Sequence, residues 1–319
     1  MRAKTPLTLV TVLLATAVLA PSAVAAETQT LVKPSPAWMT DSLKADISAA
    51  GADGVKVAAE TLNTECPGVA TRGVSANGCI VAPYGCTANF IFTNDGNWRT
   101  QPYIGTASHC TDKVGEPVIM QVDTTTLAEV GTVAKRTASQ EPGEDFALIQ
   151  VYPAVAAKWG VNPAIPTGGP QGIHTGCDPG QVVKNYGHGY GVAVAQGKPE
   201  AGLTAHWYDD AYGFFGYGFP GDSGSGITLA DNTSAGNFTH IILFDPKLQF
   251  APGELAGTRT TAILRFLGST WSQVNADGSL SSQSTTACGE SVTGGSGSGG
   301  GGKGGGGKGG GGKGGGKSR

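Results

Sequence analysis

Three short motifs, which follow one another in the order His, Asp, Ser, constrain the fold of this chain more than any other feature. His109 lies in the run TASHC, Asp145 in EDFAL and Ser223 in GDSGSG. Hydrolases that combine these residue types carry them in different chain orders on different folds, Ser, Asp, His in α/β-hydrolases and Asp, His, Ser in subtilisins. The α/β-hydrolase pattern G-x-S-x-G is also unmatched, because Ser225 replaces its last glycine. The sequence therefore argues against both folds.

The three residue types together suit nucleophilic catalysis. A serine hydroxyl attacks a carbonyl at neutral pH only when a neighbouring base takes its proton, and an imidazole does so when a buried carboxylate holds its other nitrogen. Ser223, His109 and Asp145 fit these roles. Glu141 and Glu144 are also close in sequence, but Asp145 directly precedes an apolar strand pattern, so its side chain is expected to point inward. Taken alone, a serine between glycines usually marks a turn, and a histidine beside a cysteine is usually a packed or solvent-facing residue. The prediction therefore rests on the combination of the motifs.

The glycine two residues before Ser223 predicts an oxyanion hole. Glycine allows the chain to turn sharply and to approach a ligand closely. The backbone N–H groups of Gly221 and Ser223 would then point the same way, toward the negative charge that develops on the attacked carbonyl oxygen.

These motifs resemble those of chymotrypsin-like (trypsin family) serine proteases, and among them the secreted proteases of actinobacteria. TASHC stands where the family has TAAHC, GDSGSG stands where it has GDSGGP, and the resemblance spans roughly residues 79 to 290. It implies an all-β fold of two antiparallel six-stranded Greek-key β-barrels with the active site between them. It also implies a disulfide from Cys86 to Cys110, since the run CTANFIF looks like the family strand that bridges to the cysteine after the histidine.

Two departures from the family pattern concern activation. The serine motif ends in Ser-Gly rather than Gly-Pro, and no I-V-G-G start is present. In the family a freed N-terminus pairs with the aspartate before the serine. Asp222 is therefore expected to have another cationic partner, for which Arg72 is a candidate.

The N-terminus and the cysteines indicate export. Residues 1–26 combine basic residues, an apolar run and small residues, the pattern of a secretory signal peptide, and the apolar run is too short to favour a membrane span. Six cysteines in an exported chain favour three disulfides over a metal site, so no metal and no cofactor are expected. Proximity suggests Cys66 with Cys79, which leaves Cys177 with Cys288. Spacing alone does not choose among the 15 connectivities.

The rest of the chain divides into four parts. Residues 27–75 form an N-terminal extension or a removable pro-segment, with a helix expected to start at Asp41 or Ser42. Residues 76–292 form the protease domain, whose two barrels meet near residues 160–171, a stretch rich in proline and glycine. Residues 293–319 are rich in glycine and lysine and are expected to be disordered.

Charge separates the catalytic body from the tail. Of 21 basic residues, two lie in the signal and five in the tail, which leaves 14 against 24 acidic residues in the body. A body near −10 argues against nucleic acid as a partner. The tail has the opposite charge, so binding to an anionic cell envelope is a hypothesis for it.

The sequence leaves open which residue the enzyme would prefer at the cleavage site. By resemblance, Tyr217 stands at the floor of the substrate pocket, where an aspartate would have indicated cleavage after Lys or Arg. An apolar or small preference is the first interpretation, and a trypsin-like preference using Asp209 or Asp245 is its rival. His188, in the run YGHGY, is expected to be structural.

The sequence thus predicts a secreted, extracellular and monomeric serine endopeptidase that is made as a zymogen and acts on proteins or peptides. The alternative is a noncatalytic exported binding protein on the same scaffold.

Overall fold

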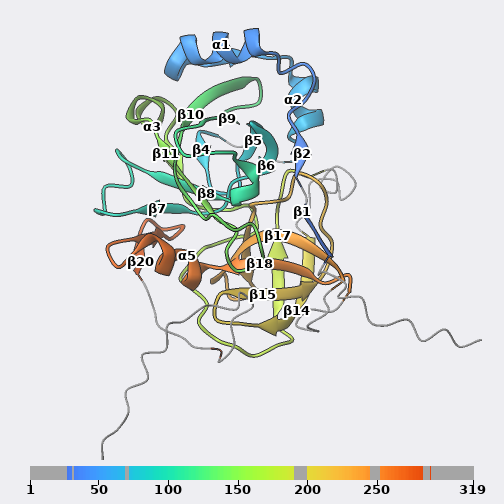
Figure 1. The fold of residues 1–319 in the computed structure, drawn as a ribbon. Coiled ribbons are helices and arrows are strands. Elements are labelled where there is room, and N and C mark those ends of the chain that lie inside the picture. Colours follow the sequence, from blue (N-terminus) through green and yellow to red (C-terminus); the bar gives the residue numbers. More distant parts are fainter. Residues whose placement is uncertain are drawn as a thin grey trace, which may run out of the picture.

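The computed structural model describes residues 27–30, 32–68, 72–189, 200–244, 252–282 and 288, and two β-barrels dominate it (Figure 1). The first barrel lies above the second in this view, and α1 (Asp41–Ala50) covers the end of the first barrel farthest from the second. The expected signal peptide and the expected tail lie outside the described residues.

The first barrel is a closed antiparallel sheet. Its strands are β5 (Cys79–Ala82), β6 (Tyr84–Thr87), β7 (Ile91–Thr93), β8 (Tyr103–Thr106), β9 (Pro117–Gln121), β10 (Thr126–Arg136) and β11 (Ala147–Val151). They pair in the order β6-β5-β9-β10-β11-β8-β7, and only residues 88–90 separate β6 from β7, so these two act as one bent strand and close the barrel.

The bend between β6 and β7 is where the chain changes partners. The sequence pattern predicts one continuous strand here, but the Ala88 N–H binds the Gly78 carbonyl at 2.8 Å on the β5 side. The next residue, Asn89, donates its N–H to Gly105 at 2.7 Å on the β8 side. One strand therefore serves both edges of the barrel, and this change of partner interrupts the regular ladder.

The second barrel repeats this plan with six strands. They are β13 (Val182–Asn185), β14 (Glu200–Trp207), β15 (Ala211–Phe215), β16 (Gly226–Leu229), β17 (Ser234–Phe244) and β18 (Leu255–Arg259). The order β17-β16-β13-β14-β15-β18 closes through a direct pairing of β17 with β18. Numbered along the chain, both barrels have the order 1-2-3-6-5-4, so the fourth strand returns beside the first as in a Greek key. The predicted fold class is confirmed.

Shorter elements surround the barrels. On the N-terminal side are β1 (Glu27–Thr30), β2 (Lys33–Pro34), the 3-10 helix η1 (Gly51–Asp53), β3 (Val55–Lys56) and α2 (Ala59–Glu65). Later in the chain are β4 (Val74–Ser75), α3 (Pro153–Trp159), β12 (Val161–Asn162), α5 (Thr260–Leu267), β19 (Ser272–Val274) and β20 (Leu280–Ser282). Among the described helices, none is long and apolar enough to cross a membrane.

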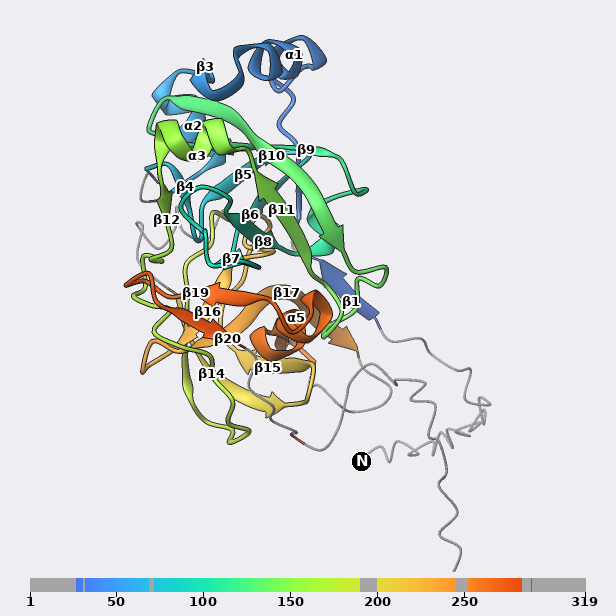
Figure 2. The same ribbon diagram turned by 90° about the vertical axis from the view of Figure 1, so that its left-hand side faces the viewer.

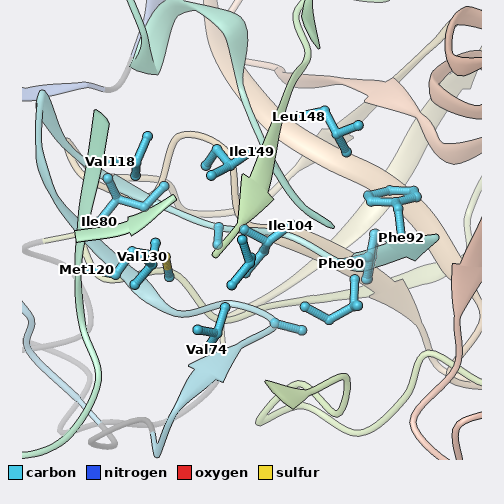
Figure 3. Close-up of a cluster of buried hydrophobic side chains, with 14 of the residues drawn as sticks. Val74, Ile80, Phe90, Phe92, Ile104, Val118, Met120, Val130, Leu148 and Ile149 are labelled. Carbon is cyan, nitrogen blue, oxygen red and sulfur yellow. The ribbon is translucent and has the colours of Figure 1, made fainter. Parts of the chain in front are cut away.

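Three clusters of buried apolar side chains stabilise the two barrels and the N-terminal segment. The largest fills the first barrel and includes Ile80, Phe92, Ile104 and Met120 from different strands (Figure 3). A smaller aromatic cluster fills the second barrel around Tyr212 and Phe214. A third cluster lies outside the first barrel, where residues of the N-terminal segment pack on β5, β9 and β10. Most of the segment 32–66 is thus built into the fold.

The disulfides join Cys66 to Cys79, Cys86 to Cys110 and Cys177 to Cys288, the three pairs that the sequence analysis expects. The first ties α2 to β5, and the second ties β6 to the segment that follows β8. The third closes a loop with a sequence separation of 111 residues.

Candidate active site

The local fold of TASHC buries His109 beside the barrel interface. After β8 the chain is extended at Ala107 and then turns in a short 3-10 helix, η2 (Ser108–Cys110). The Cys110 N–H binds the Ala107 carbonyl at 3.2 Å, and its sulfur is bonded to Cys86. A helical turn and a disulfide thus fix the backbone on which His109 is carried.

Asp145 holds His109 from inside the protein. Its carboxylate is completely buried, and its Oδ2 lies 2.5 Å from the Nδ1 of His109. Its Oδ1 accepts hydrogen bonds from the backbone N–H of Ser108 at 2.6 Å, from the Ser108 hydroxyl at 2.8 Å and from the backbone N–H of His109 at 3.1 Å. Both oxygens are therefore occupied, and the imidazole is held in one orientation.

The backbone of Asp145 is bound by the second barrel, although the residue precedes a strand of the first. Its N–H donates to Thr258 Oγ1 at 3.1 Å, and its carbonyl accepts from Asn237 Nδ2 at 2.9 Å. Asn237 also accepts from the Thr258 N–H at 3.1 Å. The acid of the pair is thus located at the joint between the barrels.

The charge state of Asp145 follows from these contacts. Burial by itself raises the pKa of this carboxyl, but the interaction with His109, the contribution of His240 and the Ser108 hydroxyl outweigh it and hold the pKa below its ordinary value. Asp145 is therefore an anion at neutral pH, as an acid that stabilises an imidazolium must be.

A second histidine, His240, lies against this pair, and the sequence analysis missed it. Its Nδ1 is 3.9 Å from Asp145 Oδ2, and its ring meets the His109 ring edge to face at 5.7 Å between centroids. Burial lowers the pKa of His240 to about 4, so the ring is neutral at neutral pH. A lone histidine within a strand carries no sequence signal of such a contact, since it depends on how β17 meets the first barrel.

Ser223 lies on a turn that requires glycine on both sides. Gly221 has φ +105°, and a Cβ there would lie 2.9 Å from the Cα of Gly189. Gly224 has φ +91°, and a Cβ there would overlap Thr106 Oγ1 and the carbonyl of Thr87. Only glycine tolerates these conformations and this crowding. The G-D-S-G run is thus a local requirement of the turn.

Ser223 is held next to the segments that carry both histidines. Its carbonyl accepts from the Thr87 N–H at 2.9 Å, and the sulfur of Cys110 lies 3.7 Å from it. Its hydroxyl lies 3.5 Å from the carbonyl of Thr239, the residue before His240. Meanwhile His109 Nε2 is buried and has no hydrogen-bond partner within the part of the chain that the structure describes.

Asp222 has backbone partners in place of the expected arginine. Its Oδ1 accepts from the Gly189 N–H at 2.7 Å and its Oδ2 from the Phe219 N–H at 2.8 Å. The nearby cation that lowers its pKa is Lys33 and not Arg72, but burial dominates and raises the pKa to about 6. The carboxylate thus braces the serine turn through amide donors.

Other predicted positions are placed as follows. Tyr217 has a side chain that is 69% exposed, so its ring does not form the floor of a buried pocket. Asp209 binds the Cys288 N–H at 2.6 Å, whereas Asp245 lies outside the described residues. Burial lowers the pKa of His188 to about 4, and its ring nitrogens lie 3.0 and 2.8 Å from the carbonyls of Pro67 and Asn77, which fits a structural role.

The cluster of His109, Asp145 and His240 also has the composition of a metal site, with ligand atoms within 4.8 Å of one another. Two ligands on a tetrahedral zinc ion stand about 3.3 Å apart, given metal bonds of about 2.0–2.1 Å. The 2.5 Å between His109 Nδ1 and Asp145 Oδ2 leaves no room for an ion between them. The contact fits a direct hydrogen bond.

Comparisons with known proteins add little to this geometry. No protein-family model and no curated protein matches the sequence. Among solved structures, the chain is similar to protease A of Thermobifida fusca (18% identity, TM-score 0.43, 61% of this chain and 96% of that one). It is also similar to the chymotrypsin of Cellulomonas bogoriensis (19%, 0.41, 61% and 96%) and to a Glu endopeptidase (16%, 0.38, 67% and 94%). At these identities and TM-scores the similarities carry no argument, and the site is interpreted from its own geometry.

Proposed function

We propose that this chain is a secreted serine endopeptidase in which Ser223 is the nucleophile, His109 the general base and then acid, and Asp145 the residue that orients the imidazole. The backbone N–H groups of Gly221 and Ser223 form the oxyanion hole. No cofactor takes part. The substrates are proteins or peptides, and the enzyme works as an extracellular monomer.

The observation that carries this proposal is the His109–Asp145 pair with its unpartnered nitrogen. The Nδ1 side is bound to a buried anion at 2.5 Å, so the proton resides on Nδ1 and Nε2 has a free lone pair. Nε2 is therefore ready to accept a proton.

We assign the hydroxyl of Ser223 as the partner of that lone pair, because the Ser223 carbonyl lies 3.7 Å from the sulfur of Cys110, the residue after His109. The hydroxyl bonds weakly to the Thr239 carbonyl at 3.5 Å, and catalytic hydrogen bonds are often long before substrate binds. A change of the serine side chain to another staggered rotamer would exchange this bond for one to His109. We expect this change when a substrate enters.

Acylation then follows from the geometry. Ser223 Oγ attacks the carbonyl carbon of the peptide bond as His109 Nε2 takes its proton, and the π electrons move to the carbonyl oxygen. His109, now an imidazolium beside the Asp145 anion, returns the proton to the amide nitrogen as the C–N bond breaks. The amine leaves, and the acyl group remains as an ester on Ser223.

Deacylation repeats these steps with water as the nucleophile. His109 takes a proton from water, the hydroxide adds to the ester carbon, and the proton returns to Ser223 Oγ as the acid product leaves. In both halves the oxyanion accepts hydrogen bonds from the N–H groups of the serine turn. The positive φ of Gly221 and the hydrogen bonds from backbone amides to the Asp222 carboxylate hold this turn in place.

Hydrolysis of fluorescein-labelled casein tests this proposal. We expect Ser223→Ala to lower kcat/KM by roughly 10⁴-fold or more, because the residual rate comes only from binding and the oxyanion hole. Ser225→Ala is the matched control in the same motif, since its hydroxyl binds Asn185 at 2.8 Å and takes no part in the chemistry. Equal rates for the wild type and a folded Ser223→Ala protein would refute the proposal and favour a noncatalytic binding protein.

A further inference from the structure

Strand β1 is an addition to a barrel that is already closed. It pairs antiparallel with β17 (Figure 2). The second barrel closes without it, because β17 also pairs with β18. Its residues contribute little to the core. Gln29 is exposed, Thr28 and Thr30 are half-buried, and no described residue of β1 belongs to a buried apolar cluster. Backbone hydrogen bonds to β17 are therefore its main attachment.

The strand is directed at the catalytic groups. In the register of the pair, Gln29 lies opposite Ile241 and Thr30 opposite His240. His240 contacts both His109 and Asp145, and the carbonyl of the residue before it, Thr239, lies 3.5 Å from the Ser223 hydroxyl. A peptide that extends along β17 in this direction arrives at the proposed nucleophile.

The chain on the other side of β1 is firmly anchored. Lys33 and Pro34 form β2, which pairs with β6 of the first barrel, so the chain passes from the second barrel to the first. Lys33 is only 4% exposed and makes an ion pair with Glu65 at 3.2 Å. The helix that carries Glu65 is tied to β5 by the Cys66–Cys79 disulfide. A weakly held strand is thus tethered by a strongly held segment.

We propose that residues 27–30 occupy the edge of β17 that receives extended polypeptide substrates, and so act as an intramolecular competitor of substrate. This inference rests on the proposed function of Ser223. A sheet edge binds any extended chain through its main-chain groups, without a requirement for particular side chains. The N-terminal segment accordingly divides in two, an inhibitory strand up to Thr30 and an integral part from residue 32 onward.

The size of the effect follows from the tether. A short linker gives an intramolecular partner an effective concentration on the order of millimolar, so even a weak four-residue strand competes well with dilute substrate. An isolated short strand pair is at best marginally stable, so substrate still displaces it. We expect release of β1 to strengthen polypeptide binding by about tenfold.

The test uses the full chain with Ser223→Ala, because an active enzyme could cleave its own strand. Gln29→Pro with Thr30→Pro removes two consecutive backbone N–H groups, one of which faces β17, and proline disfavours a paired strand. Gln29→Ala with Thr30→Ala keeps both N–H groups and is the matched control. The Kd of fluorescein-labelled casein is then measured by fluorescence anisotropy for the two proteins.

The inference predicts about tenfold tighter casein binding by the proline pair than by the alanine pair. Equal Kd values would overturn it, as would undetectable binding by both proteins. A chain that begins at residue 32 provides a second comparison and should bind like the proline pair. The parent chain with Ser223 intact separates failure of this inference from failure of the proposed function. If the proposed function is wrong, this chain does not react with a fluorophosphonate, whether or not β1 competes with substrate.

Discussion

The two barrels have the same strand order but position the proposed catalytic residues in different ways. The first has a buried apolar cluster of 30 described residues, and it carries His109 on a turn closed by a disulfide. The second has smaller clusters of nine and of four described residues, and it carries Ser223 on a glycine turn braced by the buried Asp222. The proposed base is thus fixed by hydrogen bonds and a disulfide beside a large apolar cluster, whereas the proposed nucleophile depends on backbone conformation and on the buried Asp222.

This difference indicates at which residues a substitution changes catalysis and at which it changes the stability of the fold. On the first side, a polar change at the His–Asp pair alters chemistry within a well-packed scaffold. On the second, the carboxyl groups of Asp222 and Glu200 are costly to bury in their charged form, so changes there alter stability with pH. The predictions below separate the two sides.

The largest expected effect is on the first side. Asp145→Asn should lower kcat for casein hydrolysis by about 10⁴-fold with little change in folding, since an amide neither fixes the right tautomer nor stabilises the imidazolium. Glu144→Gln, the exposed neighbour, should stay within about twofold. If the two variants have similar rates, Asp145 does not orient His109.

A smaller effect concerns the N-terminal segment that packs on the first barrel. Leu62 is fully buried with Ile47 and Met39 in the third cluster. Leu62→Ala should reduce the free energy of unfolding by about 2–5 kcal/mol, from lost burial and the cavity left behind. Urea unfolding measures this quantity. A loss below about 0.5 kcal/mol would show that the segment is dispensable and would support a removable pro-segment throughout.

The smallest effect is on the second side and appears as a pH dependence of stability. Burial and the nearby Asp222 raise the pKa of Glu200 to about 8 from an ordinary value of 4.5. Between pH 4.5 and about pH 8 the native state keeps a proton on Glu200 that the unfolded state has lost. The free energy of unfolding therefore decreases as the pH rises through this range. The native state thus favours the protonated form of Glu200.

Glu200→Gln should therefore gain stability relative to the wild type as pH rises across this window. The difference in unfolding free energy between the two proteins is the useful quantity, because the buried histidines contribute equally to both. Glu141→Gln, at an exposed position, serves as the control. A difference that stays constant from pH 5 to pH 8 would mean that Glu200 has an ordinary pKa.

Much of this architecture could be predicted from the sequence, for physical reasons. Turn residues and short β-rich runs indicate both barrels. The sequence also predicts a helix that starts at Asp41 or Ser42, and α1 begins at Asp41 behind a Thr40 cap. The glycines around Ser223 reflect a local conformation. The structure also brings His109 and Asp145 together, as the chain order of their motifs suggested.

The rest depends on contacts between distant segments. The pairing of the polar run ETQT with β17 has no pattern of its own, because an edge strand held by backbone bonds needs no particular side chains. The position of His240 beside His109 and Asp145, and the backbone N–H partners of Asp222, also have no local sequence pattern. Tyr217 was placed in the pocket by resemblance alone, and the fold exposes its ring.

The most direct test of the central claim is to treat the purified protein with a fluorophosphonate and to locate the adduct by tandem mass spectrometry. A serine reacts quickly only when a base activates it beside an oxyanion hole. We expect a single adduct on Ser223 that Asp145→Asn slows strongly. A folded protein with its disulfides intact, its strand β1 released and no adduct on Ser223 would contradict the account.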